Sequence, residues 1–212
     1  MKLNNQILNT LKSYTSNIVD DVFIEYQKGE HDKKNELIQF LNDVASVSDK
    51  VNVVLLPDSD NQNPLKFEVR KNDISHGIYF DGIPSGHEFN SFILAILQVG
   101  GTPSTLDPDI QKIIAELNED LNFETIVSLS CENCPDIVQA LNQFAILNPK
   151  ITNTTIDGGL HPKMIKSRNV QSVPTIFLNG EEFASGRVSI AKILDKLMKD
   201  KNSKASTIST NI

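Results

Sequence analysis

The sequence predicts an α/β protein in which mixed central β-sheets are covered on both faces by helices. β-Branched, apolar segments alternate along the chain with segments of helical periodicity. The order of predicted elements, αβαβ-ββα, occurs twice, which indicates an internal duplication with halves of about 100 residues. The chain has 212 residues, of which 39% are hydrophobic, and this is enough for one large core or two small ones.

The first half follows this order in residues 1–101. Apolar residues at helical spacing predict amphipathic helices, and runs of Val, Ile, Phe and Tyr bounded by Gly, Pro or Asp predict strands. The expected elements are a helix over 3–18, a strand over 21–27, a helix over 37–45, a strand over 51–56, two extended segments over 65–70 and 76–80, and a helix over 89–97.

The second half repeats the order in residues 102–198. The dipeptide Asn179-Gly180 is a strong signal for a tight hairpin turn. The expected elements are a helix over 110–117, strands over 123–129 and 151–156, a helix between them after Cys131, a short helix near 164, a hairpin over 173–184, and a helix over 190–197. Residues 199–212 lose this periodicity and become rich in Lys, Ser, Thr and Asn, which is typical of a polar linker.

Composition argues against several classes of function. The net charge is −7 and the lysines are scattered, so we expect no nucleic-acid partner. No apolar run approaches the ~20 residues of a membrane helix, and the N-terminus lacks the apolar stretch of a secretory signal. We therefore expect a cytoplasmic protein with no membrane partner.

The two cysteines, Cys131 and Cys134, form a CxxC motif between an apolar strand and a helix. At a helix N-terminus the unpaired backbone N–H groups and the helix dipole favour an anion, so Cys131 can hold a thiolate near neutral pH. Cys134 follows about one helical turn later, close enough to attack a mixed disulfide. Pro135 suits the first turn of a helix.

Two other interpretations of this pair remain open. A zinc site needs two further ligands, and His161 and His87 are the nearest histidines worth naming, neither at a ligand spacing. The cysteines can also be two inert buried residues. The position of the CxxC motif between a strand and a helix favours redox chemistry over a zinc site and over two inert cysteines.

Pro174 begins an apolar segment, where proline is ordinarily tolerated as the first residue of a strand. A sharper hypothesis is that the Val173-Pro174 peptide is cis and faces the CxxC. A proline there removes an N–H that would compete for the cysteines and leaves backbone groups free for a docked substrate chain.

These motifs together resemble a known family. The segments 128–142, 147–149, 156–159 and 173–180, with 82–89 and 94–101 in the first half, are similar to the N-terminal domain of the flavoprotein subunit of bacterial alkyl hydroperoxide reductase. The resemblance covers nearly the whole chain. It implies two fused thioredoxin-like folds, the first without a CxxC (residues 1–101) and the second with one (102–198), followed by a linker towards a reductase domain.

The resemblance also implies a function. Electrons from NADH would pass through FAD in a C-terminal reductase domain to the CxxC, and then to the disulfide of a peroxiredoxin partner. Cys131 would attack the partner's disulfide, Cys134 would resolve the mixed disulfide, Pro174 would shape the groove, and Glu88 would accept a proton. No GxGxxG motif stands in the chain, so we expect no cofactor within it.

The sequence departs from the expected pattern at two positions. The family commonly has His after the first cysteine, where this chain has Glu132, whose charge disfavours a neighbouring thiolate. Single-domain thioredoxins carry an acid six residues before the first cysteine, and here that residue is Thr125. The proton acceptor must therefore come from elsewhere, and the resemblance, through the segment 86–89, implies Glu88 for this role.

Two alternatives to the relay remain. The chain can be a free-standing protein-disulfide oxidoreductase served by a general reductase, which shares the fold and chemistry but differs in partner. It can also be a non-catalytic interaction module in which the CxxC is incidental. Reduction of insulin disulfides by the prereduced protein separates the module from both enzymes.

Overall fold

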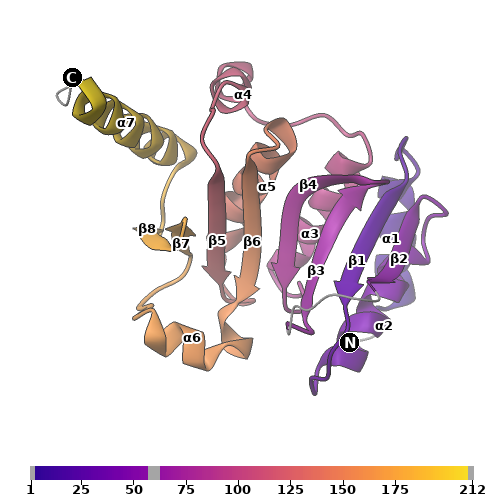
Figure 1. Cartoon of the computed structure of the whole chain (residues 1–212). Coiled ribbons are helices and arrows are strands. Elements are labelled where there is room, and N and C mark those ends of the chain that lie inside the picture. The colour runs from indigo at the N-terminus through magenta and orange to yellow at the C-terminus, as the bar shows by residue number, and fades with distance from the viewer. Residues whose placement is uncertain (1–2, 57–62, 210–212) are drawn as a thin grey trace.

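The computed structural model describes residues 3–56 and 63–209, with side chains described as far as residue 199. Both halves contain the expected elements in the expected order (Figure 1). The first half comprises α1 (Asn5–Thr15), β1 (Val22–Gln27), α2 (Lys34–Ala45), β2 (Val51–Leu56), β3 (Lys66–Lys71), β4 (Ile74–Asp81) and α3 (Glu88–Val99). The second comprises α4 (Pro108–Ala115), β5 (Leu121–Val127), α5 (Cys134–Leu147), β6 (Ile151–Asp157), the 3-10 turn η1 (Gly158–Leu160), α6 (Pro162–Ser167), β7 (Thr175–Leu178), β8 (Glu181–Ser185) and α7 (Ile190–Ser209).

The strands of the described residues form one eight-stranded mixed sheet in the order β2-β1-β3-β4-β6-β5-β7-β8. Each half contributes four strands with the same relative order, second-first-third-fourth. The halves join because β4 pairs in parallel with β6, from Ile78 opposite Asn153 to Asp81 opposite Ile156. The duplication is therefore arranged head to tail along one sheet.

Local chemistry accounts for several element boundaries. The Asp107 side chain accepts a hydrogen bond from the Asp109 N–H, with Pro108 in the first turn of α4. Asn179 and Gly180 both have positive φ angles, 51° and 88°, as a tight hairpin between β7 and β8 requires. The hairpin predicted at Asn179-Gly180 is confirmed.

The prediction of helices on both faces is wrong for the first half. Figure 1 shows α1, α2, α3 and α5 on one side of the sheet, and no described helix over the opposite side of β1, β3 and β4. On that open side the strands carry half-buried, mostly polar side chains, including an ion pair between Arg70 and Glu25 at 2.9 Å. Helical periodicity shows that a helix has a buried side, but it does not assign that side to a particular sheet face.

The last helix is longer than expected. α7 continues past Leu197 to Ser209, so the polar segment from residue 199 to 209 is helical, and residues 210–212 lie outside the described residues. No glycine or proline stands between Leu197 and Ser209 to end a helix, although the apolar periodicity has been lost.

One main hydrophobic core runs through both halves, beside two smaller clusters in the second half. Buried residues from Leu3 to Leu197 belong to one contiguous cluster. In the first half its centre is aromatic, with Phe67, Phe80 and Phe92 in mutual contact at centroid distances of 5.4–5.5 Å and Phe40 packed on Phe92. This shared core fixes the position of the first half against the cysteine-bearing second half.

Candidate active site

The cysteine pair lies in the turn between β5 and α5. Cys131 precedes the helix, and its N–H donates to the Ser128 carbonyl at 2.9 Å, while Cys134 is the first residue of α5. The two are joined by a disulfide with a Cα–Cα distance of 5.6 Å. Cys131 is half-buried and Cys134 is fully buried. Of the two sulfurs, Cys131 is therefore the one that an incoming disulfide can reach.

The segment that holds Pro174 faces this pair. The Val173-Pro174 peptide is cis, as predicted. The Val173 carbonyl oxygen lies 3.9 Å from the Cys131 sulfur, and the Pro174 carbonyl accepts a hydrogen bond from the Gly186 N–H at 2.8 Å. Val173 also packs on the small cluster of Val127, Cys134 and Val138. The backbone before β7 therefore forms one wall beside Cys131.

Glu88 is the first residue of α3 and is 1% exposed. Neither of its carboxylate oxygens has a hydrogen-bond partner among the described residues. Burial raises the pKa of this carboxyl to about 7, and the nearby Ser91 hydroxyl opposes the rise. A buried carboxyl that titrates near neutral pH can both accept and release a proton under physiological conditions.

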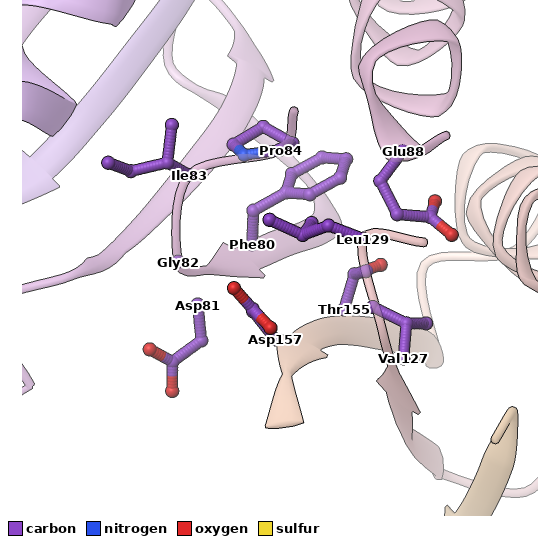
Figure 2. Close-up of a pocket in the computed structure, with 10 residues that line it drawn as sticks. All are labelled: Phe80, Asp81, Gly82, Ile83, Pro84, Glu88, Val127, Leu129, Thr155 and Asp157. Carbon is purple, nitrogen blue, oxygen red and sulfur yellow. The ribbon is translucent and has the colours of Figure 1, made fainter. Parts of the chain in front are cut away.

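A small cavity of about 10 Å³ connects Glu88 to the second half. Figure 2 shows the Glu88 side chain leaving the start of α3 and ending beside Thr155 and Val127 of the second half. Val127 in turn packs against Cys134. Glu88 is thus separated from the buried cysteine by the layer that contains this valine.

The loop before Glu88 rests directly on the turn that leads to the cysteines. The His87 N–H donates to the Leu129 carbonyl at 3.0 Å. Gly86 has a φ of 56°, and a Cβ atom there would lie 2.3 Å from the same carbonyl oxygen. Only glycine permits this close approach of two backbones. The first half therefore touches the cysteine-bearing turn through residues 86–88.

Thr125 cannot supply the missing acid, as expected. It is fully buried, and its hydroxyl donates to the Asn153 side chain at 2.8 Å. The Asn153 amide donates in turn to Asn142 at 2.8 Å. Thr125 thus belongs to a neutral, hydrogen-bonded chain of side chains, at the sequence position that holds an acid in single-domain thioredoxins.

Sequence reasoning missed the strongest side-chain contact between the halves, an ion pair. The His161 ring nitrogen Nε2 lies 2.9 Å from a carboxylate oxygen of Asp81, which is almost fully buried, and this hydrogen bond raises the pKa of His161. His161, named above as a remote zinc ligand, is instead bonded to Asp81. Across the described residues no group of three or more His, Cys, Asp and Glu side chains could hold a metal ion. A pairing across 80 residues leaves no local sequence signal.

Comparison with known proteins identifies the fold and the class of chemistry. Residues 122–199 match the thioredoxin domain family. The crystal structure of the N-terminal domain of alkyl hydroperoxide reductase AhpF from Enterococcus faecalis superposes with a TM-score of 0.83 at 27% identity, covering 91% of this chain and 98% of that one. With the cysteine pair at the start of α5, these matches define a thioredoxin-like thiol–disulfide oxidoreductase domain.

Curated relatives specify the family further. A Pseudomonas aeruginosa protein, named as the F subunit of alkyl hydroperoxide reductase, is 41% identical over 187 residues, which are 88% of this chain and 36% of that protein. A Bacillus subtilis protein named NADH dehydrogenase is 39% identical over 197 residues, 93% of this chain and 38% of that protein. The chain is a homologue of the N-terminal domain of alkyl hydroperoxide reductase AhpF and spans little more than a third of the length of these curated relatives.

No described helix is both long enough and apolar enough to cross a lipid bilayer.

Proposed function

We propose that this chain is a dithiol–disulfide relay domain that carries electrons from a flavin-dependent NADH reductase domain to the disulfide of a peroxiredoxin. The observation that carries the proposal is the difference in exposure within the cysteine pair, because Cys131 is partly accessible and Cys134 is fully buried at the start of α5. The names of the relatives, an alkyl hydroperoxide reductase and an NADH dehydrogenase, support this direction of electron flow.

The proposed reaction has two exchange steps. The Cys131 thiolate attacks one sulfur of the peroxiredoxin disulfide, a mixed disulfide forms, and the other peroxiredoxin sulfur leaves as a thiolate that takes up a proton. Cys134 then loses its proton, which Glu88 would take up through a water molecule because the layer with Val127 separates the two side chains, and the Cys134 thiolate attacks the Cys131 sulfur. The Cys131–Cys134 disulfide forms again, the second peroxiredoxin thiol is released, and two electrons have moved to the partner. Pro174 and the Val173 carbonyl shape the groove in which the partner docks.

The other parts of the relay would lie outside these residues. We assign residues 1–101 and 102–198 to the two thioredoxin-like units and the remainder to the connection towards a reductase domain. FAD and NADH would bind in that domain, because this chain holds no glycine-rich dinucleotide motif. Because the relay draws on NADH, we expect it to work in the cytoplasm.

Trapping of the mixed disulfide tests the proposal. We expect Cys134→Ser to accumulate a covalent adduct with an oxidised peroxiredoxin through Cys131, and Cys131→Ser to accumulate none. Mass spectrometry of the adduct identifies the joined cysteines. Equal trapping by both variants would show that the assigned roles are wrong.

A second substrate distinguishes the relay from its alternatives. The prereduced protein should reduce the peroxiredoxin disulfide much faster than the insulin disulfides. Comparable rates on the two substrates would favour a general protein-disulfide oxidoreductase, and failure on both would favour a non-catalytic interaction module.

A further inference from the structure

The ion pair between His161 and Asp81 joins the two halves of the chain where β4 and β6 end side by side. Asp81 is the last residue of β4, and His161 lies between η1 and α6, which follow β6. The Asp81 side chain is only 4% exposed, and its second carboxylate oxygen accepts a hydrogen bond from the Asn63 side chain. The carboxylate is thus held within the first half, and His161 binds it from the second.

His161 also begins the segment that leads to the cis peptide. Its carbonyl accepts a hydrogen bond from the Ile165 N–H at 3.0 Å, which fixes the first turn of α6 to it. Helix α6 and Val173 contact the same small cluster of side chains. The cluster consists of Ile126, Ile156 and Phe177, with Met164, Ile165, Val170 and Val173 packed against it. Because the Val173 carbonyl lies 3.9 Å from the Cys131 sulfur, α6 and the wall beside Cys131 share one support.

Tight packing connects these elements to one another. A Cβ atom at Gly158 in η1 would lie 3.1 Å from the Ile165 side chain of α6. Directly after β4, a Cβ atom at Gly82 would lie 2.9 Å from the Cβ atom of Asp157, at the end of β6. Closely packed interiors transmit small displacements instead of absorbing them. A shift of α6 relative to β4 therefore reaches the cluster on which Val173 packs.

We propose that the His161–Asp81 ion pair positions the wall beside Cys131. The pair holds α6 against the first half, and α6 holds Val173 through the cluster that they share. His161 is thus a positioning residue for disulfide exchange, since it acts through Val173. This role rests on the proposed docking of a partner chain against the wall, and it gives the cysteine-free first half a second task besides supplying Glu88.

The strength of this contact depends on the charge of His161. The hydrogen bond to Asp81 raises the pKa of His161, burial opposes the rise, and the charge of Asp157 adds to it. The charged groups around the pair are Asp157, Glu88 in the cavity that both aspartates line, Lys66 opposite Asp81 on β3, and Lys163 on α6. Figure 2 shows the Asp81 side chain pointing away from Glu88. The contribution of the ion pair is complete below pH 6.5 and is lost as pH rises through the raised pKa of His161.

Methyl NMR of the oxidised 212-residue chain, labelled at valine, tests the proposal without any partner. The Val173 resonances should shift with pH at the same midpoint as the His161 ring. The shift should disappear in His161→Gln, whose amide can still donate a hydrogen bond but carries no charge. Val53 in β2 is the internal control and should not follow this midpoint. A Val173 shift that persists in His161→Gln would come from another group, such as Glu88, and would overturn the proposal, as would Val173 resonances that do not respond to pH.

Exchange kinetics of the reduced chain measure the effect on docking. With oxidised peroxiredoxin at pH 6, His161→Gln should lower kcat/KM by about fivefold, mainly through KM, and at pH 9 variant and parent should be alike. Alkylation of Cys131 by iodoacetamide needs no docked chain and should be unchanged. His31→Gln, at an exposed histidine, is the matched control. Equal kcat/KM of variant and parent at pH 6, or an equal fall in the alkylation rate, would overturn the proposal. A parent that does not reduce peroxiredoxin would refute the relay alone, because the Val173 resonances still decide the role of His161.

Discussion

At the scale of single residues, Glu88 is the most unusual group in the chain. Its carboxyl is buried without a hydrogen-bond partner among the described residues, and burial raises its pKa to about 7. An unpaired buried carboxyl destabilises a fold unless it is neutral. The structure therefore keeps this acid at a cost in stability that depends on pH.

We expect that cost to appear as a loss of stability with rising pH. The pKa of Glu88 is higher in the folded than in the unfolded state, so its stability contribution is complete below pH 4.5 and is lost as pH rises towards 7. Between pH 5 and 8, Glu88→Gln should gain roughly 3 kcal/mol in unfolding free energy relative to the parent. Urea denaturation of the oxidised protein at the two pH values measures this difference.

Glu116→Gln is a matched control, because Glu116 is exposed at the end of α4 and should show no such pH-dependent difference. A parallel pH dependence of parent and Glu88→Gln would show that the carboxyl is not unusually buried in solution. For the reduced protein, a catalytic Glu88 also requires that iodoacetamide reactivity across pH 4 to 9 differ between parent and Glu88→Gln.

Glu132 gives a second prediction at this scale. It is exposed and follows Cys131 directly, so its negative charge opposes the thiolate, although water screens the interaction. Glu132→His should increase the fraction of Cys131 present as thiolate at neutral pH and make the disulfide more oxidising. Thiolate absorbance and a redox titration measure the two effects. An unchanged or smaller thiolate fraction would contradict the prediction.

At the scale of elements, the loop between β4 and α3 is the critical connection. It leaves the first half, rests on the Leu129 carbonyl through Gly86 and His87, and places Glu88 next to the second half. The loop thereby connects a helix of one unit with the cysteine-bearing turn of the other.

We expect Gly86→Ala to destabilise the protein by about 3 kcal/mol, because the added methyl group meets a backbone oxygen and the residue needs a positive φ. Gly180→Ala is the control. Gly180 also has a positive φ, 88°, but nothing lies within 4 Å of its added Cβ, so the loss should be about 1 kcal/mol. Equal losses, measured from urea midpoints, would show that the contact with Leu129 is not tight.

Sequence reasoning was reliable where a signal is local. Periodicity located the helices and strands, and Asn179-Gly180 located the hairpin. Strand β5 was expected two residues too late, over 123–129 instead of Leu121–Val127, because its polar residues interrupt the apolar run.

Contacts between distant segments were beyond this reasoning. The pairing of β4 with β6 and the hydrogen bond from His161 to Asp81 join residues about 80 positions apart, and neither leaves a pattern in the surrounding sequence. For the site, the cysteines and the cis peptide followed from local motifs, whereas Glu88 was singled out only through a family resemblance. Burial of a charged residue at the start of a helix has no sequence signature, because acidic residues are common there on exposed helices as well.

At the scale of the whole molecule, the continuous sheet and shared core unite the two halves. We therefore expect them to unfold in one cooperative transition. The chain has no tryptophan and only three tyrosines, Tyr14, Tyr26 and Tyr79, all in the first half, so near-UV circular dichroism of tyrosine reports that half. Its urea transition should coincide with the far-UV signal of the whole chain. A separate tyrosine transition would show that the halves fold independently.

The position of Glu88 has a further consequence for the stoichiometry of reduction. The structure holds the disulfide, a neutral pair of sulfurs, and in this state the carboxyl titrates at about pH 7. Reduction would create a thiolate across the layer that contains Val127, and its negative charge would stabilise the protonated acid. Near neutral pH, reduction of the disulfide by two electrons is then accompanied by uptake of an additional fraction of a proton at Glu88. The midpoint potential of the Cys131–Cys134 pair would therefore fall more steeply with pH than protonation of the two cysteines alone would cause. The first half of the chain, which contains no cysteine, would thereby make the driving force of disulfide exchange in the second half depend on pH.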